Sequence, residues 1–481
     1  MTKSKFSDFQ LSSDILKAIE MLKFKNPTGV QEQVIPVILD KMDIIVKSQT
    51  GSGKTAAFAI PLCEMVNWDE HTPQALVMVP TRELALQVKE DIFNIGRFKR
   101  LKVPAIYGKF PIHVQEKELK QKTHVVVGTP GRVIDHLERG TLDTSNVRYL
   151  IIDEADEMLN MGFIDDLEFI IKSLPKDRLT ILLSATMPKD IDTLCRKYMN
   201  DPIHVEIEEE HSAVDRIYQA RYAVDEKEKM RLLKDLSIVE NPDSCIIFCN
   251  TKQKVDDIYS ELDYSGYTCR KIHGGMEQRD RIEVMNKFKQ GVFRYLVATD
   301  VAARGIDIDS ISLVVNYDIP QEKESYVHRI GRTGRVDKEG RAITFSPHYE
   351  NRFLTDIEEY IGKKIPLKEK PNKETVNQMK QAFDEKINTI PELKETKGAA
   401  FEEEIMKLHI NAGKKTKMRP ADVVGTLCNI EGLTAEDIGI INVQDISTFV
   451  EILNNKGEMV YNELQKMNIN CLLYTSPSPR D

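Results

Sequence analysis

The sequence predicts an α/β protein built from two tandem parallel-sheet domains and a small α+β domain. Between residues 40 and about 206, short apolar strands alternate with amphipathic segments of helical period, and a second such alternation ends near residue 365. This alternation is typical of parallel sheets that are covered by helices. At 481 residues the chain is also too long to fold around a single hydrophobic core.

Apolar runs mark the strands that we expect in the two α/β domains. In the first domain they lie at residues 43–46, 75–79, 125–127, 150–152 and 180–183. A polar and acidic passage interrupts the pattern at 206–215, and the strands of the second domain follow at 245–248, 269–272, 295–298, 313–315 and 342–345. We therefore place the first domain at residues 1–210 and the second at 211–365.

The remaining chain divides into a linker, a small domain and a tail. Residues 366–416 are rich in Lys and Glu, with helical periodicity at 376–387 and 401–408, which predicts a charged linker with one or two surface helices. In the small domain, residues 417–470, the pattern predicts strand, helix, strand, strand and helix at 422–428, 435–439, 440–443, 448–453 and 459–466. This order requires one more strand to close the sheet. The tail, 471–481, contains two prolines and changes composition abruptly, so we expect it to be non-native and to supply no such strand.

Composition indicates a globular protein of the cytoplasm. Hydrophobic residues make up 41% of the chain and charged residues 30%, which is ordinary for a globular fold. The net charge of -9 argues against a uniformly basic nucleic-acid-binding surface but leaves room for a local basic channel. Seven cysteines without a C-x-x-C pair predict reduced thiols rather than a disulfide or zinc framework. The sequence has no signal-peptide core and no apolar run of about 18 residues, so we expect a cytoplasmic location.

A glycine-rich segment begins at Ser48, ends at Thr55, and lies between the first predicted strand and a helical run. Gly51 and Gly53 allow backbone N–H groups to converge on an anion at a helix N-terminus. Lys54 can reach the outer phosphates of a nucleotide, and the Thr55 hydroxyl can hold Mg²⁺. Ser48 stands where the pattern G-x-x-x-x-G-K-[ST] has its first glycine. Taken alone, the segment is either a nucleotide site or an ordinary glycine-rich turn.

An acidic segment, Asp153-Glu154-Ala155-Asp156, follows the predicted strand at 150–152. Carboxylates at the end of a parallel strand would lie beside the glycine-rich turn. In a P-loop NTPase the first acid holds the Mg²⁺ shell, and a neighbouring acid can orient the attacking water. A solvated acidic turn is the alternative. The glycine-rich segment lies upstream at a spacing that allows several strand–helix units, which favours the nucleotide site.

Together with further short strings, these segments resemble the DEAD-box ATP-dependent RNA helicases over residues 6–350. The matching strings lie at 24–31, 48–55, 80–85, 129–132, 153–156, 184–186, 273–281, 299–300, 304–307 and 328–335. The resemblance implies two RecA-like domains that use ATP and Mg²⁺ and act on RNA. It also implies that ATP is hydrolysed fast only when the domains close, because the second domain supplies arginines that the first lacks.

The resemblance assigns residues to the nucleotide site. It implies catalytic roles for Lys54, Asp153, Glu154 and two arginine fingers, Arg332 and Arg335. It places Mg²⁺ at Thr55 and Asp153. Nucleotide contacts are implied for Phe6, Phe24, Gln31, Ser48, Gln49, Thr50, Gly51, Ser52, Gly53, Lys54, Thr55, Gly305 and Asp307. The string 184–186 would couple this site to domain closure.

The same resemblance implies contacts from both domains to an RNA backbone. Hydroxyl, arginine and backbone groups suit phosphate contact without sequence readout. The implied residues are Pro80, Thr81, Arg82, Gly108, Thr129, Pro130, Gly131, Arg132, Gln278, Arg281, Thr299 and Asp300. Lys109 replaces the second glycine of one family motif.

The small domain resembles the RRM-like RNA-recognition domain of DbpA-type bacterial helicases, both in element order and in the string at 419–427. The resemblance implies a hairpin of large-subunit ribosomal RNA as its target. The predicted strands at 422–428 and 448–452 carry only one aromatic residue, so we do not expect bases to stack on the sheet face. Loops and the basic run Lys414, Lys415, Lys417 and Arg419 are the predicted contacts. A solvated linker end explains that run equally well.

These observations predict a monomeric RNA-stimulated ATPase that locally unwinds short RNA duplexes during assembly of the large ribosomal subunit. One alternative is an ATP-dependent RNA clamp or scaffold that does not unwind. Another is a DNA translocase on the same tandem domains, which the DEAD string and the Q motif at 24–31 disfavour. A strand-displacement assay with and without ATP separates unwinding from clamping.

Overall fold

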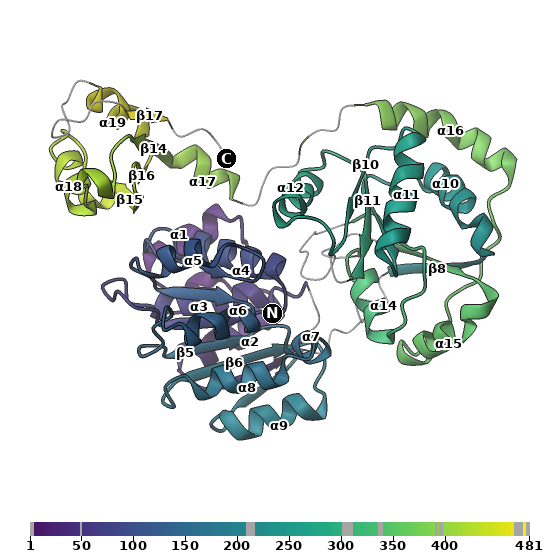
Figure 1. The fold of residues 1–481 in the computed structure, drawn as a ribbon, viewed down its shortest axis with the longest axis horizontal. Helices are drawn as coiled ribbons and strands as arrows, with labels where there is room; N and C mark the ends of the chain where they lie inside the picture. Colours follow the sequence, from purple (N-terminus) through teal and green to yellow (C-terminus); the bar gives the residue numbers. More distant parts are fainter. Residues whose placement is uncertain are drawn as a thin grey trace.

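The structure is a computed structural model that describes residues 4–48, 51–207, 217–300, 311–334, 340–389, 393, 398–465 and 475–477. Its strands form three separate sheets (Figure 1). The parts of the chain built on these sheets are named, in order, the first domain, the second domain and the third unit. In the described ranges, no helix combines the length and the apolar character needed to cross a membrane.

A seven-stranded parallel sheet forms the centre of the first domain, with the strand order β3-β4-β2-β5-β6-β1-β7. Its strands are β1 (Ile44–Lys47), β2 (Ala75–Met78), β3 (Ala105–Ile106), β4 (Val125–Gly128), β5 (Tyr149–Ile152), β6 (Leu179–Ser184) and β7 (Ile203–Glu206). The five strands predicted in this domain are confirmed. β3 has only two residues, and in β7 the polar residues His204 and Glu206 are exposed, so neither shows the apolar run that predicts a buried strand.

Helices cover both faces of this sheet. One face packs with α1 (Ser13–Met21), α2 (Gly29–Leu39), α3 (Lys54–Met65) and α4 (Arg82–Ile95). The other packs with α6 (Pro130–Glu138), α7 (Ala155–Asn160), α8 (Ile164–Lys172) and α9 (Lys189–Tyr198). The turn η1 (Phe6–Asp8) and α5 (Ile112–Leu119) complete the domain. Because both faces are covered, the central strands are apolar throughout, which explains why short apolar runs located them.

The second domain repeats this architecture with a six-stranded parallel sheet of order β10-β11-β9-β12-β13-β8. Its strands are β8 (Ile217–Ala223), β9 (Cys245–Cys249), β10 (Cys269–Ile272), β11 (Tyr295–Thr299), β12 (Leu313–Asn316) and β13 (Gly340–Ser346), which confirms the five predicted ones. One face packs with α12 (Gln278–Lys289), α14 (Lys323–Ile330) and α15 (Asn351–Tyr360). The other packs with α10 (Lys229–Glu240), α11 (Lys252–Tyr264) and α16 (Lys373–Asn388). α16 is a helix expected within the linker, and its buried Phe383 joins the core of this domain.

The third unit is a four-stranded antiparallel sheet of order β15-β16-β14-β17 with two helices. Its elements are β14 (Met406–Ile410), α18 (Pro420–Leu427), β15 (Ile438–Val443), β16 (Thr448–Ile452), α19 (Gly457–Leu464) and β17 (Thr475–Pro477). A short helix, α17 (Ala399–Glu404), precedes β14. The strands predicted at 440–443 and 448–453 and the helix at 459–466 are confirmed.

Three expectations for the third unit are wrong. The segment 422–428 is helix α18, because Pro420 occupies its first turn and Asp422 accepts the Arg419 N–H at 2.9 Å, both of which are helix-start signals. The first strand is instead β14, which lies in the predicted linker, where the chain changes from helix α17 to strand within the segment predicted as helical. The segment 435–439 forms only the turn η5 (Ala435–Asp437) before β15. The tail does supply a fourth strand, since β17 pairs with β14.

Candidate active site and RNA-binding surfaces

β1 delivers the glycine-rich loop to the carboxyl edge of the first sheet, and α3 begins at Lys54. Gly51 and Gly53 have φ angles of 87° and 91°, a left-handed conformation that favours glycine and turns backbone N–H groups toward an anion. Lys54 is buried, and its Nζ donates to the Ser48 carbonyl oxygen at 2.6 Å. The loop therefore holds the ammonium group where phosphate oxygens would meet it.

The predicted Q-motif glutamine is bonded to this loop. Gln31 Nε2 donates to the Gly53 carbonyl oxygen at 3.2 Å, and Gln31 Oε1 accepts from the Thr28 backbone N–H at 3.0 Å. Thr28 Oγ1 donates to the Ser52 carbonyl oxygen at 2.9 Å. A side chain at Gly53 would clash, because its Cβ would lie 2.7 Å from Gln31 Nε2. The sequence-predicted glutamine and loop thus form one hydrogen-bonded unit.

Other predicted nucleotide residues are placed less directly. The rings of Phe6 and Phe24 lie 6.4 Å apart, and Phe6 is buried in the core of the first domain. The structure thus gives Phe6 a packing role, and its stacking on a base stays a prediction. Five predicted residues lie outside the described residues: Gln49, Thr50, Gly305, Asp307 and Arg335.

Two carboxylates follow β5 at the same edge of the sheet. Asp153 is buried; burial raises its pKa, and the Lys54 ammonium acts in the opposite direction. Burial and the Asp153 charge raise the pKa of Glu154 to about 7, although Arg332 and Lys54 oppose the shift. A carboxyl group with a pKa near neutrality suits a group that positions or deprotonates water.

The third acid of the segment connects β6 to α7. Asp156 accepts hydrogen bonds from the Thr186 backbone N–H at 2.8 Å and from Thr186 Oγ1 at 2.9 Å. Its own N–H donates to Ser184 Oγ at 3.2 Å, and that hydroxyl donates to the Thr186 carbonyl oxygen at 2.6 Å. The predicted string 184–186 is therefore bonded to the helix that carries the acidic residues.

The second domain reaches these carboxylates through α14. The Nδ1 atom of His328, near the end of α14, lies against the carboxylate of the buried Glu157 of α7. Arg332 follows the helix, is 6% exposed, and donates from Nε to the His328 carbonyl oxygen at 3.3 Å. Its charge lowers the pKa of Glu154 across the domain interface. A cation of the second domain thus acts directly on the predicted catalytic acid of the first.

Predicted RNA-contacting residues of the two domains meet one another across the same interface. Arg82 Nη1 donates to Gln278 Oε1 at 3.1 Å. Glu83 Oε1 accepts from Gln278 Nε2 at 3.1 Å and pairs with Arg281 Nη2 at 2.9 Å. Burial lowers the pKa of Arg82, and the neighbouring Arg281 adds to this effect while Glu83 opposes it. These contacts join α4 of the first domain to α12 of the second.

The predicted RNA residues gather at three helix N-termini. Thr81 caps α4 by accepting the Leu84 N–H at 3.2 Å, and Arg82 begins that helix. Thr129 precedes α6, which begins with Pro130, Gly131 and Arg132, and Gln278 and Arg281 lie in the first turn of α12. N–H groups of a first helical turn attract phosphates without reading bases. Arg82 also borders Gly108, where a Cβ would lie 3.7 Å from its Nη2.

Thr299 and Asp300 were predicted to contact RNA. Thr299 ends β11, and Asp300, which follows it, pairs with a residue to which sequence reasoning assigned no role. Arg329 of α14 is 1% exposed and pairs with both Asp300 oxygens, at 2.5 and 2.7 Å. Its guanidinium also donates to the Asp318 carbonyl oxygen at 2.6 Å and to Asn250 Oδ1 at 2.9 Å. Arg329 therefore ties α14 to the ends of three strands.

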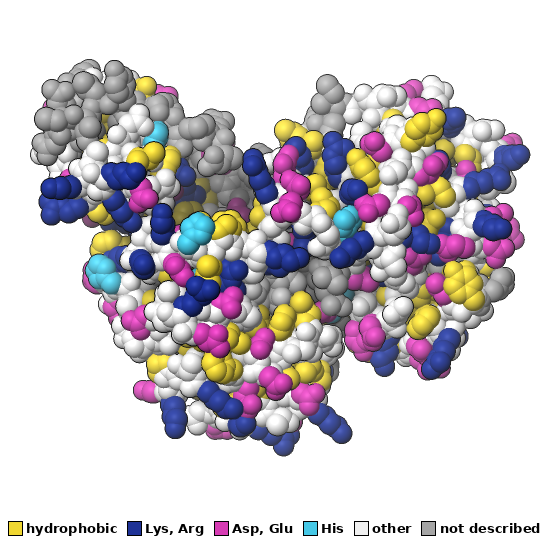
Figure 2. Space-filling model, in the orientation of Figure 1, with side chains coloured by type: hydrophobic (Ala, Val, Ile, Leu, Met, Phe, Trp, Pro, Cys, Tyr) yellow, Lys and Arg dark blue, Asp and Glu magenta, His cyan; other side chains and the backbone are white. Residues whose placement is uncertain are grey.

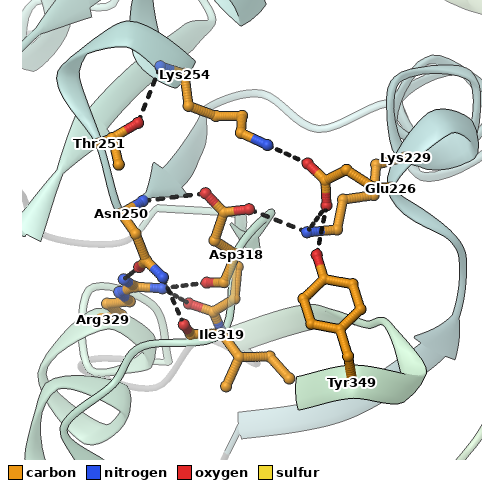
Figure 3. Close-up of polar contacts among 10 residues, drawn as sticks. Glu226, Lys229, Asn250, Thr251, Lys254, Asp318, Ile319, Arg329 and Tyr349 are labelled. Carbon is orange, nitrogen blue, oxygen red and sulfur yellow. Dashed lines mark hydrogen bonds and ion pairs between the residues drawn. The ribbon is translucent and has the colours of Figure 1, made fainter.

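Figure 3 shows how this group extends into a polar network. Asp318 accepts from Lys229 Nζ at 3.0 Å and from the Asn250 backbone N–H at 3.1 Å. Lys229 is completely buried and also pairs with Glu226 at 2.9 Å. Glu226 in turn pairs with Lys254 and accepts from Tyr349 Oη at 3.1 Å. No local string indicated this network, because its members come from six separate segments.

We expect Arg329→Met to lower the free energy of unfolding by about 3–5 kcal/mol, since it leaves the Asp300 charge without its buried partner. Urea unfolding of the full chain measures this. Arg341→Met is the matched control, because Arg341 is exposed where it pairs with Glu240 and should contribute less than about 1 kcal/mol. Equal effects of the two substitutions would refute the anchoring role of Arg329.

The open face of the third sheet carries an aromatic pair that sequence reasoning missed. His409 of β14 stacks on Phe449 of β16, with ring centroids 4.8 Å apart and an interplanar angle of 20°. Lys407 Nζ lies 5.2 Å from the Phe449 ring. The alternation of Leu408 and Ile410, both buried, with Lys407 and His409 was the available signal. Phe449 is the one Phe, Tyr or Trp on the described strands of this sheet, as expected, and His409 adds an imidazole from a strand that was not predicted.

The basic run lies on the surface of the third unit. Lys414, Lys415 and Lys417 are exposed, and Arg419 pairs with Asp422 at 3.3 Å. Burial lowers the pKa of Lys102 in the first domain, and the nearby charges of Lys122 and Lys414 lower it further. Figure 2 shows Lys and Arg side chains gathered on the part of the third unit next to the first domain. Such a surface suits phosphate contact, as predicted for the run.

Known families match all three parts of the chain. Residues 28–194 match the DEAD/DEAH box helicase family, 228–337 the helicase conserved C-terminal domain, and 407–471 the DbpA RNA binding domain. The chain is 56% identical to the ATP-dependent RNA helicase DbpA of Bacillus subtilis (strain 168) over 97% of both proteins. It is 45% identical to the DEAD-box ATP-dependent RNA helicase CshA of Bacillus licheniformis over 80% of both.

Solved structures give the same result for the helicase domains. One match is the structure of S. cerevisiae Dbp5 bound to RNA and ADP BeF3. The superposition includes 80% of this chain and 100% of the Dbp5 chain, with a TM-score of 0.70 and 31% sequence identity. A second Dbp5 structure, bound to Gle1 and IP6, gives a TM-score of 0.66 at 31% identity, over 80% of this chain and 99% of the other. Family, relatives and site geometry agree: this chain belongs to the DEAD-box ATP-dependent RNA helicases of the DbpA type.

Proposed function

We propose that this helicase separates short RNA duplexes locally, by closing its two domains on RNA, during assembly of the large ribosomal subunit. The observation that carries the proposal is the domain interface itself. On one side, His328 lies against Glu157 of α7 and the charge of Arg332 acts on Glu154. On the other side, Arg82 and Glu83 contact Gln278 and Arg281. A ligand on either side therefore acts on the same closing movement.

On the nucleotide side, each residue has a role that its position supports. Lys54 and the loop N–H groups bind the outer phosphates. Glu154, with its pKa near 7, positions the attacking water and accepts its proton. Arg332 stabilises the charge that develops on the transferred phosphoryl group once the domains close, and Arg335 would share that work.

The residues present also fit Mg²⁺. Asp153 is a buried carboxylate close enough to Lys54 for their charges to interact, and Thr55 follows Lys54 at the start of α3. Carboxylate and hydroxyl oxygens are ligands that Mg²⁺ prefers. Asp153 and Thr55 would hold the ion, which when bound neutralises phosphate charge.

On the RNA side, the three helix N-termini and the arginines grip one strand by its backbone. A strand held across two closed domains bends and cannot stay paired with its complement, so closure separates a few base pairs. This mechanism needs no sequence readout by the helicase domains. The third unit supplies the preference for ribosomal RNA, through the basic run 414–419 and a base that stacks on the His409–Phe449 pair.

We expect His409→Ala to weaken binding of a large-subunit ribosomal RNA fragment by the full chain about tenfold, because one base–aromatic stack contributes about 1–3 kcal/mol. Fluorescence anisotropy at fixed salt measures this. His204→Ala is the matched control, since His204 is exposed on the edge strand β7 of the first domain. Unchanged affinity of the His409 variant would exclude base stacking there.

Strand displacement tests the proposal as a whole. The full chain should separate a short RNA duplex when ATP is supplied, and should prefer duplexes joined to ribosomal RNA fragments over unrelated RNA and DNA. Hydrolysis of ATP without strand separation would replace the proposal with an RNA clamp or scaffold. Equal activity on DNA duplexes would favour a translocase.

A further inference from the structure

The third unit lies against the first domain, although the chain connects it to the second. α17 brings Phe401, which is completely buried, to within 6.0 Å of the Phe98 ring, measured between centroids. Ile405 and Leu453 are also buried there and belong to the same apolar core as α1 and α4. The contact is therefore an apolar interface, not a chance approach of two surfaces.

One arginine of the first domain organises the centre of this interface. The Arg97 guanidinium carbon lies 5.3 Å from the Phe93 ring and 5.1 Å from the Phe401 ring. Its Nη2 pairs with Glu451 of β16 at 3.0 Å, and both side chains are largely buried. A pair shielded from water in this way is stronger and more specific than an exposed one.

In the polar contacts around this centre, the first domain supplies the donors, and α17 or the third unit supplies the acceptors. Four further first-domain cations donate to oxygen atoms of α17 and the third unit. These contacts are Lys17 to Glu404 at 2.5 Å and Asn454 at 3.0 Å, Arg100 to the Ala435 carbonyl at 2.7 Å, Lys102 to the Ile441 carbonyl at 3.0 Å and Lys117 to Asp445 at 3.4 Å. The two surfaces are thus complementary in charge as well as in apolar packing.

The docked position leaves the predicted RNA surface accessible. Glu451 and Phe449 project from the same face of β16, because they are two residues apart. Arg97 covers only the Glu451 end, whereas Lys407 is exposed and His409 and Phe449 are half-buried. Docking and RNA binding by the third unit are therefore compatible.

When α17 is docked on the first domain, the segment that follows α16 becomes a second link between the helicase domains, covalent along the chain and non-covalent at the docking contact. The end of α16 is fixed to the second domain by Phe383 and by Lys386, whose Nζ donates to the Asn241 carbonyl oxygen at 2.8 Å. Gly398, with φ 94°, begins α17 on the first domain. Residues 389–397 join these fixed points and span at most about 35 Å when extended. Elsewhere the chain passes from one helicase domain to the other between β7 and β8, so the docked chain links the two domains at two points.

We propose that the surface of α1 and α4 containing Lys17, Arg97 and Phe98 is a docking site for α17 and the third unit, and that docking favours domain closure. Two connections hold the domains at a higher effective concentration than one. Less RNA is then needed to reach the closed state. The mechanism rests on closure as proposed above, but docking itself can be observed without any reaction.

Single-molecule FRET on the full chain tests docking directly. Cys428 of the third unit is exposed, and the other described cysteines are buried, so Cys428 can carry one dye in a Cys471→Ser background. Lys120→Cys, at an exposed first-domain position, carries the other. The parent chain should show a major high-transfer population, and Phe401→Ala should abolish it. A charge exchange provides the specific control: Lys17→Glu should reduce the population, and adding Glu404→Lys should restore it.

RNA-stimulated ATP hydrolysis tests the consequence. With an unrelated single-stranded RNA, Phe401→Ala should raise the RNA concentration for half-maximal stimulation about tenfold, while kcat at saturating RNA stays unchanged. Lys176→Glu, at an exposed position of the first domain outside the contact, should change neither quantity. Absence of the high-transfer population in the parent chain would overturn docking. If Phe401→Ala removes the high-transfer population but leaves the RNA concentration for half-maximal stimulation unchanged, docking does not favour domain closure.

Discussion

Arg332→Ala should reduce RNA-stimulated ATP hydrolysis by roughly 10³-fold, the effect typical of removing an arginine that stabilises phosphoryl transfer. Arg332 belongs to the second domain, yet its charge already acts on Glu154 of the first. The nucleotide-binding loop and Gln31 lie wholly in the first domain, so binding of ATP should persist. The measurements are kcat at saturating RNA and the affinity for a fluorescent ATP analogue.

Two further substitutions make this test specific. Arg332→Lys keeps the positive charge but not the planar fork of donors, so its kcat should lie between those of the parent chain and Arg332→Ala. Arg352→Ala, at an exposed position of α15, should leave kcat unchanged. If the Arg332→Ala enzyme keeps a third of the parental kcat, another residue supplies the positive charge that stabilises phosphoryl transfer.

Short sequence motifs were sufficient to predict features that depend only on neighbouring residues. Gly51, Gly53 and Lys54 are neighbours in the sequence, and their positive φ angles and helix start follow from residue type. The central strands of both large sheets were found because burial on two faces makes them continuously apolar. Edge strands such as β7 were not predicted, because their exposed polar residues interrupt the continuous apolar run.

The third unit was harder to predict because its elements are short and ambiguous. The spacing of Phe401, Ile405 and Leu408 fits a helix, but the chain changes from α17 to β14 between them. β17 is a three-residue strand with a proline, and it is defined by pairing with β14 rather than by its own composition. Neither feature can be read from a window of the sequence.

Contacts between distant segments explain the remaining omissions. Arg329 was included in a predicted motif, but its partners Asn250, Asp300 and Asp318 are brought together only by the order of three strands. Lys17 and Glu404 are 387 positions apart, and their pairing depends on where an entire domain docks. Sequence patterns supplied the candidate catalytic and RNA-binding residues, and the fold was needed to find the residues that hold those candidates in place.

Glu154→Gln is expected to abolish turnover, by about 10³-fold, while leaving ATP and RNA bound, because general-base catalysis contributes about 10²–10⁴-fold. Burial and Asp153 raise the pKa of Glu154 to about 7, so its carboxylate can accept a proton at neutral pH. The amide has the same shape and can occupy the same backbone conformation, with φ 53°, but it cannot accept that proton. Lys54→Ala should differ by losing nucleotide binding itself, since Lys54 meets the phosphates before any reaction.

Equilibrium and single-turnover measurements separate these two expectations. Binding of a fluorescent ATP analogue and of single-stranded RNA should be retained by Glu154→Gln, and single-turnover hydrolysis should be lost. Glu138→Gln, at an exposed position of α6, is the matched control and should behave as the parent chain.

The Glu154→Gln enzyme would bind ATP and RNA without forming and releasing product. It should therefore accumulate in the closed state and hold RNA longer than the parent chain does in the presence of ATP. Turnover of the Glu154→Gln enzyme at the parental rate would assign the base to another group, and Asp153, the adjacent buried carboxylate, would be the next residue to test.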